Sequence, residues 1–80
     1  MRVLFFGRLA EIAGGRTREA PDDIASLAAL RDYLTEVDPV LAQALLSAGV
    51  RAAVNKIVAT GDIALAPGDE VAFMPPLSGG

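Results

Sequence analysis

The hydrophobic pattern at the start of the chain is that of a β-strand. Residues 2–7 form an almost continuous apolar run in which Val3 and Phe5 fall on one face and Leu4 and Phe6 on the other. Such a run is typical of a strand buried on both faces, but a domain of this size covers only one face of a sheet well. We therefore predict a strand over residues 2–7 with one of its two sets of side chains exposed.

Helical spacing follows in three places, over residues 8–13, 27–37 and 39–48. The longest of these segments places its polar residues, Arg31 among them, on the side that faces water. Its opposite side is one apolar stripe, which consists of Leu27, Leu30, Leu34 and Val37. We expect this stripe to pack on a sheet.

The predicted helices have suitable residues at their ends. Ser26 is the expected N-cap of the longest helix, and Asp38 followed by Pro39 is the expected start of the next one. Gly14 and Gly49 are expected to end the first and the last helix, as glycine often does.

Further strands are predicted over residues 16–20, 51–55 and 70–74, while residues 56–63 are irregular and hold at most a short strand. The first and last strands are the most apolar, so we place them side by side at the centre of the sheet. The predicted fold class is therefore α+β, with a mixed sheet and helices packed on one of its faces. This is the β-grasp arrangement of ubiquitin.

Strand alternation also predicts a surface for a partner. If Val3, Phe5 and their equivalents in the last strand point into the core, the neighbouring side chains must point outward. The outward set consists of Leu4, Phe6, Ala72 and Met74, and Val58 is expected to join it. We predict a partner interface formed by Leu4, Phe6, Val58 and Met74; the alternative is that these residues pack beneath a loop.

Composition excludes several kinds of chemistry. The 80 residues include no cysteine and no histidine, which rules out disulfides, thiolate or imidazole metal ligands and Ser-His or Cys-His nucleophiles. The net charge is −3 and the basic residues form no stripe, so nucleic acid is not an expected partner. No apolar run is long enough to span a membrane and no signal-peptide pattern precedes the first strand, so we expect a cytoplasmic protein.

Few polar side chains remain as candidates. The acidic pairs at residues 22–23 and 69–70 lie in turns, where such residues bond to their own backbone. Lys56, the single lysine, is either a conjugation site or, more simply, a solvated surface residue. Asn55 either orders a loop or contacts a partner.

The last residues differ in character from the rest of the chain. Residues 1–76 are expected to form one β-grasp domain, and residues 77–80 a flexible C-terminal tail that ends in Gly-Gly. Pro75 and Pro76 lie between the two and cannot donate to a neighbouring strand, so the sheet must stop there. A stiff Pro-Pro segment followed by a slender Gly-Gly end suits insertion of the C-terminus into a narrow site on another protein.

The ending also carries a family resemblance over the whole chain. The motif Pro-Gly-Asp-Glu-Val at residues 67–71, the ending Pro-Pro-Leu-Ser-Gly-Gly and the Ala-Val-Asn at residues 53–55 resemble the small subunit of molybdopterin synthase. That family consists of ubiquitin-like sulfur carrier proteins. It usually has an aromatic residue where this chain has Met74, and methionine keeps the apolar character with a more adaptable side chain.

The resemblance implies a chemistry for the C-terminal carboxylate. An E1-like adenylyltransferase would use ATP to adenylate Gly80, and a sulfur donor would convert it to a thiocarboxylate. Leu77, Ser78 and Gly79 would thread this group into the large subunit of the synthase, whose active site makes the dithiolene of the molybdenum cofactor. The chain itself would be a non-catalytic subunit of this heteromer, with no bound cofactor and no metal.

Two other roles stay open at this point. A related carrier for thiamine thiazole synthesis, or for another thiolation pathway, would use the same chemistry at Gly80 with a different acceptor enzyme. A ubiquitin-like modifier would instead be conjugated to lysines of target proteins through Gly80.

Overall fold

The computed structural model describes residues 1–76. The predicted tail, with Leu77, Ser78, Gly79 and Gly80, lies outside the described residues. Within residues 1–76 the chain forms, in order, β1 Arg2–Phe5, α1 Arg8–Ala13, β2 Thr17–Glu19, α2 Leu27–Val37, α3 Pro39–Leu45, β3 Arg51–Val54, β4 Ile57–Val58 and β5 Glu70–Met74.

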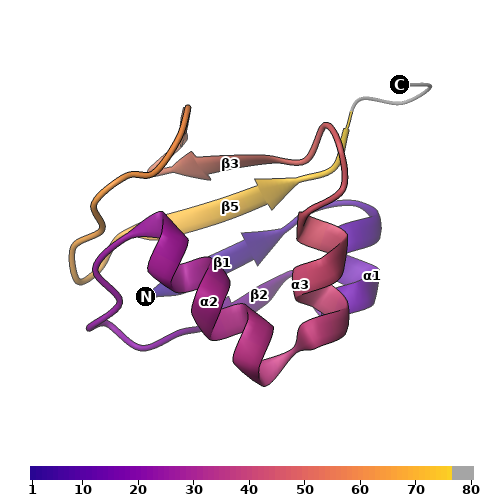
Figure 1. Cartoon of the computed structure of the whole chain (residues 1–80), viewed down its shortest axis with the longest axis horizontal. Helices are drawn as coiled ribbons and strands as arrows, with labels where there is room; N and C mark the ends of the chain where they lie inside the picture. The colour runs from indigo at the N-terminus through magenta and orange to yellow at the C-terminus, as the bar shows by residue number, and fades with distance from the viewer. Residues whose placement is uncertain (77–80) are drawn as a thin grey trace.

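The strands form one mixed sheet in the order β2-β1-β5-β3-β4. The central strands β1 and β5 run parallel, as their arrows show in Figure 1, while the other neighbouring strands are antiparallel. The α2 and α3 helices pack on one face of this sheet, and their apolar residues share a single core with it. The predicted α+β class, the helices on one face and the central pairing of the first and last strands are all confirmed.

The core lies between the inner face of the sheet and the helices. Val3 and Phe5 of β1 and Val71 and Phe73 of β5 are fully buried. The rings of Phe5 and Phe73 stack with their centroids 5.9 Å apart, a geometry that aromatic pairs favour. The helices cover these strands with five leucines, namely Leu27, Leu30, Leu34, Leu41 and Leu45.

The helix starts follow from local chemistry. The Ser26 hydroxyl accepts a hydrogen bond from the Ala29 amide at 3.1 Å, and Asp38 Oδ1 accepts one from the Leu41 amide at 3.1 Å. Each bond satisfies an amide that has no partner within its helix. Asp38 also pairs with Arg18 at 3.1 Å, which ties the start of α3 to β2. Both predicted caps are confirmed.

Two positions of α2 differ from their predicted environment. Val37 is 53% exposed, because it is the last residue of α2, where the chain turns into α3 and no longer faces the sheet. Arg31 was expected in water, but its guanidinium lies 5.2 Å from the centroid of the Phe73 ring. It is four residues from Leu27, so it borders the apolar stripe, and its long stem allows the charged end to lie over the aromatic face.

Several predicted boundaries also change: the first strand ends at Phe5 and not at residue 7, and the strands expected over residues 16–20 and 51–55 span Thr17–Glu19 and Arg51–Val54. The last helix ends at Leu45 and not immediately before Gly49, which lies in the following loop with a φ of +86°. Ile57 and Val58 form the edge strand β4, which is the short strand that the segment over residues 56–63 was expected to hold at most. They pair with β3 across a two-residue turn, so the hairpin depends on turn geometry more than on a long hydrophobic pattern.

Candidate functional site: the outer face of the sheet and the exit of the tail

The outer face of the sheet carries an apolar surface, which we call the outer-face patch. It consists of Leu4, Phe6, Ala53, Val58, Ala72 and Met74, and it surrounds a shallow hollow of about 300 Å³. Phe6 and Val58 remain 38% and 45% exposed. The structure therefore brings together all four residues predicted to form a partner interface; their binding role stays a prediction.

The patch follows from strand pairing. Leu4 pairs with Ala72 across the parallel centre, and Ala53 pairs with Ala72 from the other side. Side chains that are paired in this way share a face of the sheet. Once one residue of each strand points into the core, alternation therefore determines which residues of all three strands point outward. An apolar surface of this kind marks a binding site more often than a chance exposure.

Two glycines hold the chain where it leaves the sheet. A Cβ placed on Gly7 would lie 3.0 Å from Cγ of Pro75, and one placed on Gly49 would lie 2.8 Å from Cβ of Pro76. Both glycines also have positive φ values, +56° and +86°. We call these four residues the proline clamp, since the absence of side chains at the glycines lets the loops close on Pro75 and Pro76.

The proline clamp positions the last described residues of the chain. Pro75 directly follows Met74, so Pro75 and Pro76 come immediately after the outer-face patch in the chain. The sequence had indicated Gly49 as a helix end and had given Gly7 no role. Contacts between residues distant in sequence, which the sequence does not display, give both glycines their importance.

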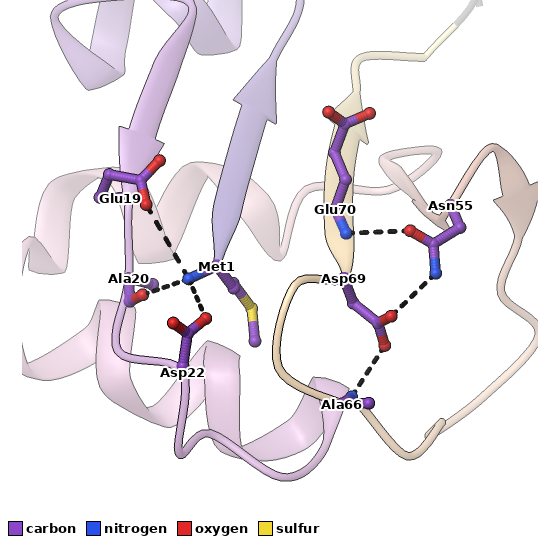
Figure 2. A network of polar contacts seen from close by, with 8 residues as sticks. All are labelled: Met1, Glu19, Ala20, Asp22, Asn55, Ala66, Asp69 and Glu70. Atoms are coloured by element: carbon purple, nitrogen blue, oxygen red, sulfur yellow. Dashed lines mark hydrogen bonds and ion pairs between the residues drawn. The ribbon is translucent and has the colours of Figure 1, made fainter.

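Asn55 orders the loop before β5 (Figure 2). Its side-chain amide donates to Asp69 Oδ1 at 3.0 Å, and its side-chain oxygen accepts from the Glu70 amide at 3.0 Å. Asp69 Oδ2 accepts a further hydrogen bond from the Ala66 amide at 2.8 Å. Of the two roles left open for Asn55, the structure shows the ordering of a loop.

The first acid of each acidic pair is engaged in structural bonds. The pKa of Asp69 is lowered by the Ala66 amide and then by the Asn55 side chain. The ammonium group of Met1 donates to Asp22 Oδ1 at 2.6 Å and to the Ala20 carbonyl at 2.7 Å, as Figure 2 shows. That ammonium lowers the pKa of Asp22 by its hydrogen bond and its charge. Both acids are thus held ionised by their neighbours, which does not suit a general acid.

Two features are absent from the described part of the chain. No three acidic, cysteine or histidine side chains within residues 1–76 come close enough together to hold a metal ion. Over the same residues, no helix has the length and apolar character that crossing a membrane requires.

The sheet order, the helices on one face and the exit beside an apolar surface define a ubiquitin-like β-grasp protein. The model of one protein family, the ThiS family, matches residues 3–80 of this chain. The chain belongs to the ThiS family.

Individual relatives extend this assignment. Over 80 residues the chain is 38% identical to the molybdopterin synthase sulfur carrier subunit of Escherichia coli (strain K12), a match that covers 100% of this chain and 99% of the relative. Among solved structures, SAMP1 from Haloferax volcanii is similar with a TM-score of 0.80 and 32% identity, over 99% of this chain and 97% of that one. A structure of H. volcanii small archaeal modifier protein 1 gives a TM-score of 0.75 at 28% identity, over 95% of each chain.

Proposed function

We propose that this chain is the sulfur carrier subunit of a molybdopterin synthase, and that it carries sulfur as a thiocarboxylate on Gly80. The observation that carries the proposal is the end-to-end similarity to a relative of that name, at 38% identity over 80 residues. The outer-face patch beside the exit of the tail supports it, because a carrier must dock on a partner while it presents its C-terminus.

The chemistry would proceed in two steps at one carboxylate. A free carboxylate is a poor acyl donor, because its charge repels nucleophiles and oxide is a poor leaving group. Attack of the Gly80 carboxylate on ATP would give an acyl adenylate and release pyrophosphate. A sulfide-level donor would then displace AMP and leave a thiocarboxylate, which is anionic and nucleophilic. Covalent carriers divide a difficult transfer into easier steps in this way.

The partners follow from the similarity to molybdopterin synthase sulfur carrier subunits. An E1-like adenylyltransferase would supply the ATP site, and the large synthase subunit would supply the active site. The outer-face patch would dock on that large subunit, and the proline clamp would direct Leu77, Ser78 and Gly79 into its channel. The carrier would itself bind no cofactor, and it would act in the cytosol, where ATP is available.

The test uses the C-terminal glycines. Chain isolated from cells with an active pathway should contain a form that is heavier by one exchange of oxygen for sulfur, located by mass spectrometry on the C-terminal peptide. Deletion of Gly79 and Gly80 should leave the melting temperature almost unchanged and abolish sulfur transfer, since the carboxylate would fall about 7 Å short. Sulfur found on another residue, or full product formation by the deleted chain, would refute the proposal.

The similarity to small archaeal modifier protein 1 favours a second candidate function. In that case Gly80 would form amide bonds with lysines of target proteins in place of a thiocarboxylate. Denaturing gels of cell extract distinguish the two, because a modifier gives many covalent adducts of higher mass. A carrier for thiamine thiazole synthesis would form the thiocarboxylate but support a different acceptor enzyme, which reconstitution with purified large subunit would reveal.

A further inference from the structure

The turn between β3 and β4 holds a lysine in an unfavourable backbone conformation. Asn55 and Lys56 form this two-residue turn with φ values of +49° and +73°. Turns with two positive φ values strongly favour asparagine followed by glycine. Asn55 fits this preference, whereas Lys56 stands where glycine would be unstrained, and a side chain there costs about 1–2 kcal/mol.

Lys56 also borders the outer-face patch. It lines the same hollow as Phe6, Val58 and Met74, together with one other charged residue, Glu70. The Glu70 carboxylate lies 3.8 Å from the guanidinium of Arg2. Within residues 1–76 the ion pairs involve Arg2, Arg18 and the N-terminus, and none involves Lys56. The hollow is therefore bordered by a lysine that forms no ion pair within residues 1–76, on a chain whose net charge is −3.

A partner that covers the patch would have to compensate this charge. Covering the hollow removes water from the ammonium group, and an ammonium without an acceptor is costly to bury. Lysine has three donors and no acceptor, so the fitting contact is a carboxylate. Its aliphatic stem meanwhile suits contact with apolar neighbours such as Val58.

We propose that Lys56 determines partner specificity by pairing with a carboxylate on the protein that covers the outer-face patch. This inference rests on the proposed function, which identifies that protein as the large synthase subunit. The strained turn places a positive charge at the edge of an apolar surface, where like-charged partners are repelled and acidic ones attracted.

The test compares three substitutions of Lys56 for binding to purified large subunit, at low and at high salt. Lys56→Glu should weaken binding about tenfold or more at low salt, mainly through the association rate, and less at high salt. Lys56→Arg keeps the charge and should bind within about twofold of the original chain. Arg16→Glu is the matched control, since it changes the net charge equally beside β2, at the opposite edge of the sheet; it should have little effect.

Lys56→Gly separates a binding role from a structural one. Glycine relieves the strained φ, so the melting temperature should rise by a few degrees, while binding should weaken about threefold or more at low salt. Unchanged binding by both Lys56→Glu and Lys56→Gly would overturn the inference and leave the proposed function intact. If the original chain does not bind the large subunit at all, the proposed function fails, and this inference with it.

Discussion

The two faces of the central strands both carry apolar side chains, but in the described part of the chain only the inner face is covered by helices. In β5, Val71 and Phe73 are fully buried, whereas their neighbours Ala72 and Met74 are half-buried. The strand β1 repeats the pattern, with Phe5 buried and the residue after it partly exposed. Within residues 1–76, α2 and α3 cover the inner face, and no helix covers the outer one.

This difference teaches that hydrophobicity in a small domain serves two purposes. A buried apolar side chain stabilises the fold by about 1.5–3 kcal/mol, and the inner face supplies this stabilisation. The outer face leaves part of its apolar area exposed, and we propose that another protein covers it. The packing of α2 and α3 on one face determines which apolar side chains of the sheet are buried.

The largest expected effect tests that division within one strand. Phe73→Ala should destabilise the domain by about 3–5 kcal/mol, because it removes a ring that stacks on Phe5 and leaves a cavity. Met74→Ala, one residue later on the outer face, should cost less than about 1 kcal/mol. Urea unfolding of the two variants measures both. Equal losses would mean that the outer face also belongs to the core.

Much of this arrangement could be predicted from the sequence. Alternation in two apolar strands separated the faces correctly, since a period of two leaves no freedom once one residue is assigned inward. The caps at Ser26 and Asp38 were also predictable, because each acts within three residues of itself.

The rest depended on contacts between distant segments. The proline clamp requires Gly7 and Gly49 to meet two prolines near the end of the chain. The position of Arg31 over Phe73 depends on how α2 lies across the sheet. The strain at Lys56 is a property of the backbone, which the residue type does not reveal. Local patterns contain none of this information.

The second effect concerns binding by the outer face. Phe6→Arg should weaken binding to the large subunit by about 2 kcal/mol or more, the scale of an interface hot spot, while the fold survives because the side chain points away from the core. Val40→Arg is the matched control: Val40 is 71% exposed on α3 and takes the same kind of substitution. Calorimetric titration of both variants gives the comparison.

Two results would contradict this prediction. Unfolding of the Phe6→Arg chain would show that Phe6 contributes to the core. Normal binding would remove Phe6 from the interface, and equal weakening by Val40→Arg would show that any added positive charge disturbs the complex.

The smallest expected effect concerns the stability of the hairpin formed by β3 and β4. The turn that carries Lys56 joins the loop before β5 through two side-chain hydrogen bonds of Asn55, which donates to Asp69 and accepts from the Glu70 amide. The Ala66 amide and the Asn55 side chain lower the pKa of Asp69, so ionised Asp69 stabilises the folded chain. This contribution is complete above the ordinary aspartate pKa of about 3.9, and it is lost as the pH falls through the lowered value.

Acid should therefore loosen the β3–β4 hairpin before it loosens the central strands. Amide hydrogen exchange followed by NMR between about pH 5 and pH 3 should show protection falling first at Asn55 and Ala59, whose amides donate to Glu70 and Ala52.

Asp69→Asn provides the control. It weakens the network at every pH and removes the titrating group, so its hairpin protection should be lower at pH 5 and change less on acidification. Asp22 and Asp38 also have lowered pKa values, and they titrate equally in both chains. If hairpin and central strands lose protection together, or if Asp69→Asn keeps the full pH dependence, then Asp69 does not hold the hairpin separately from the core.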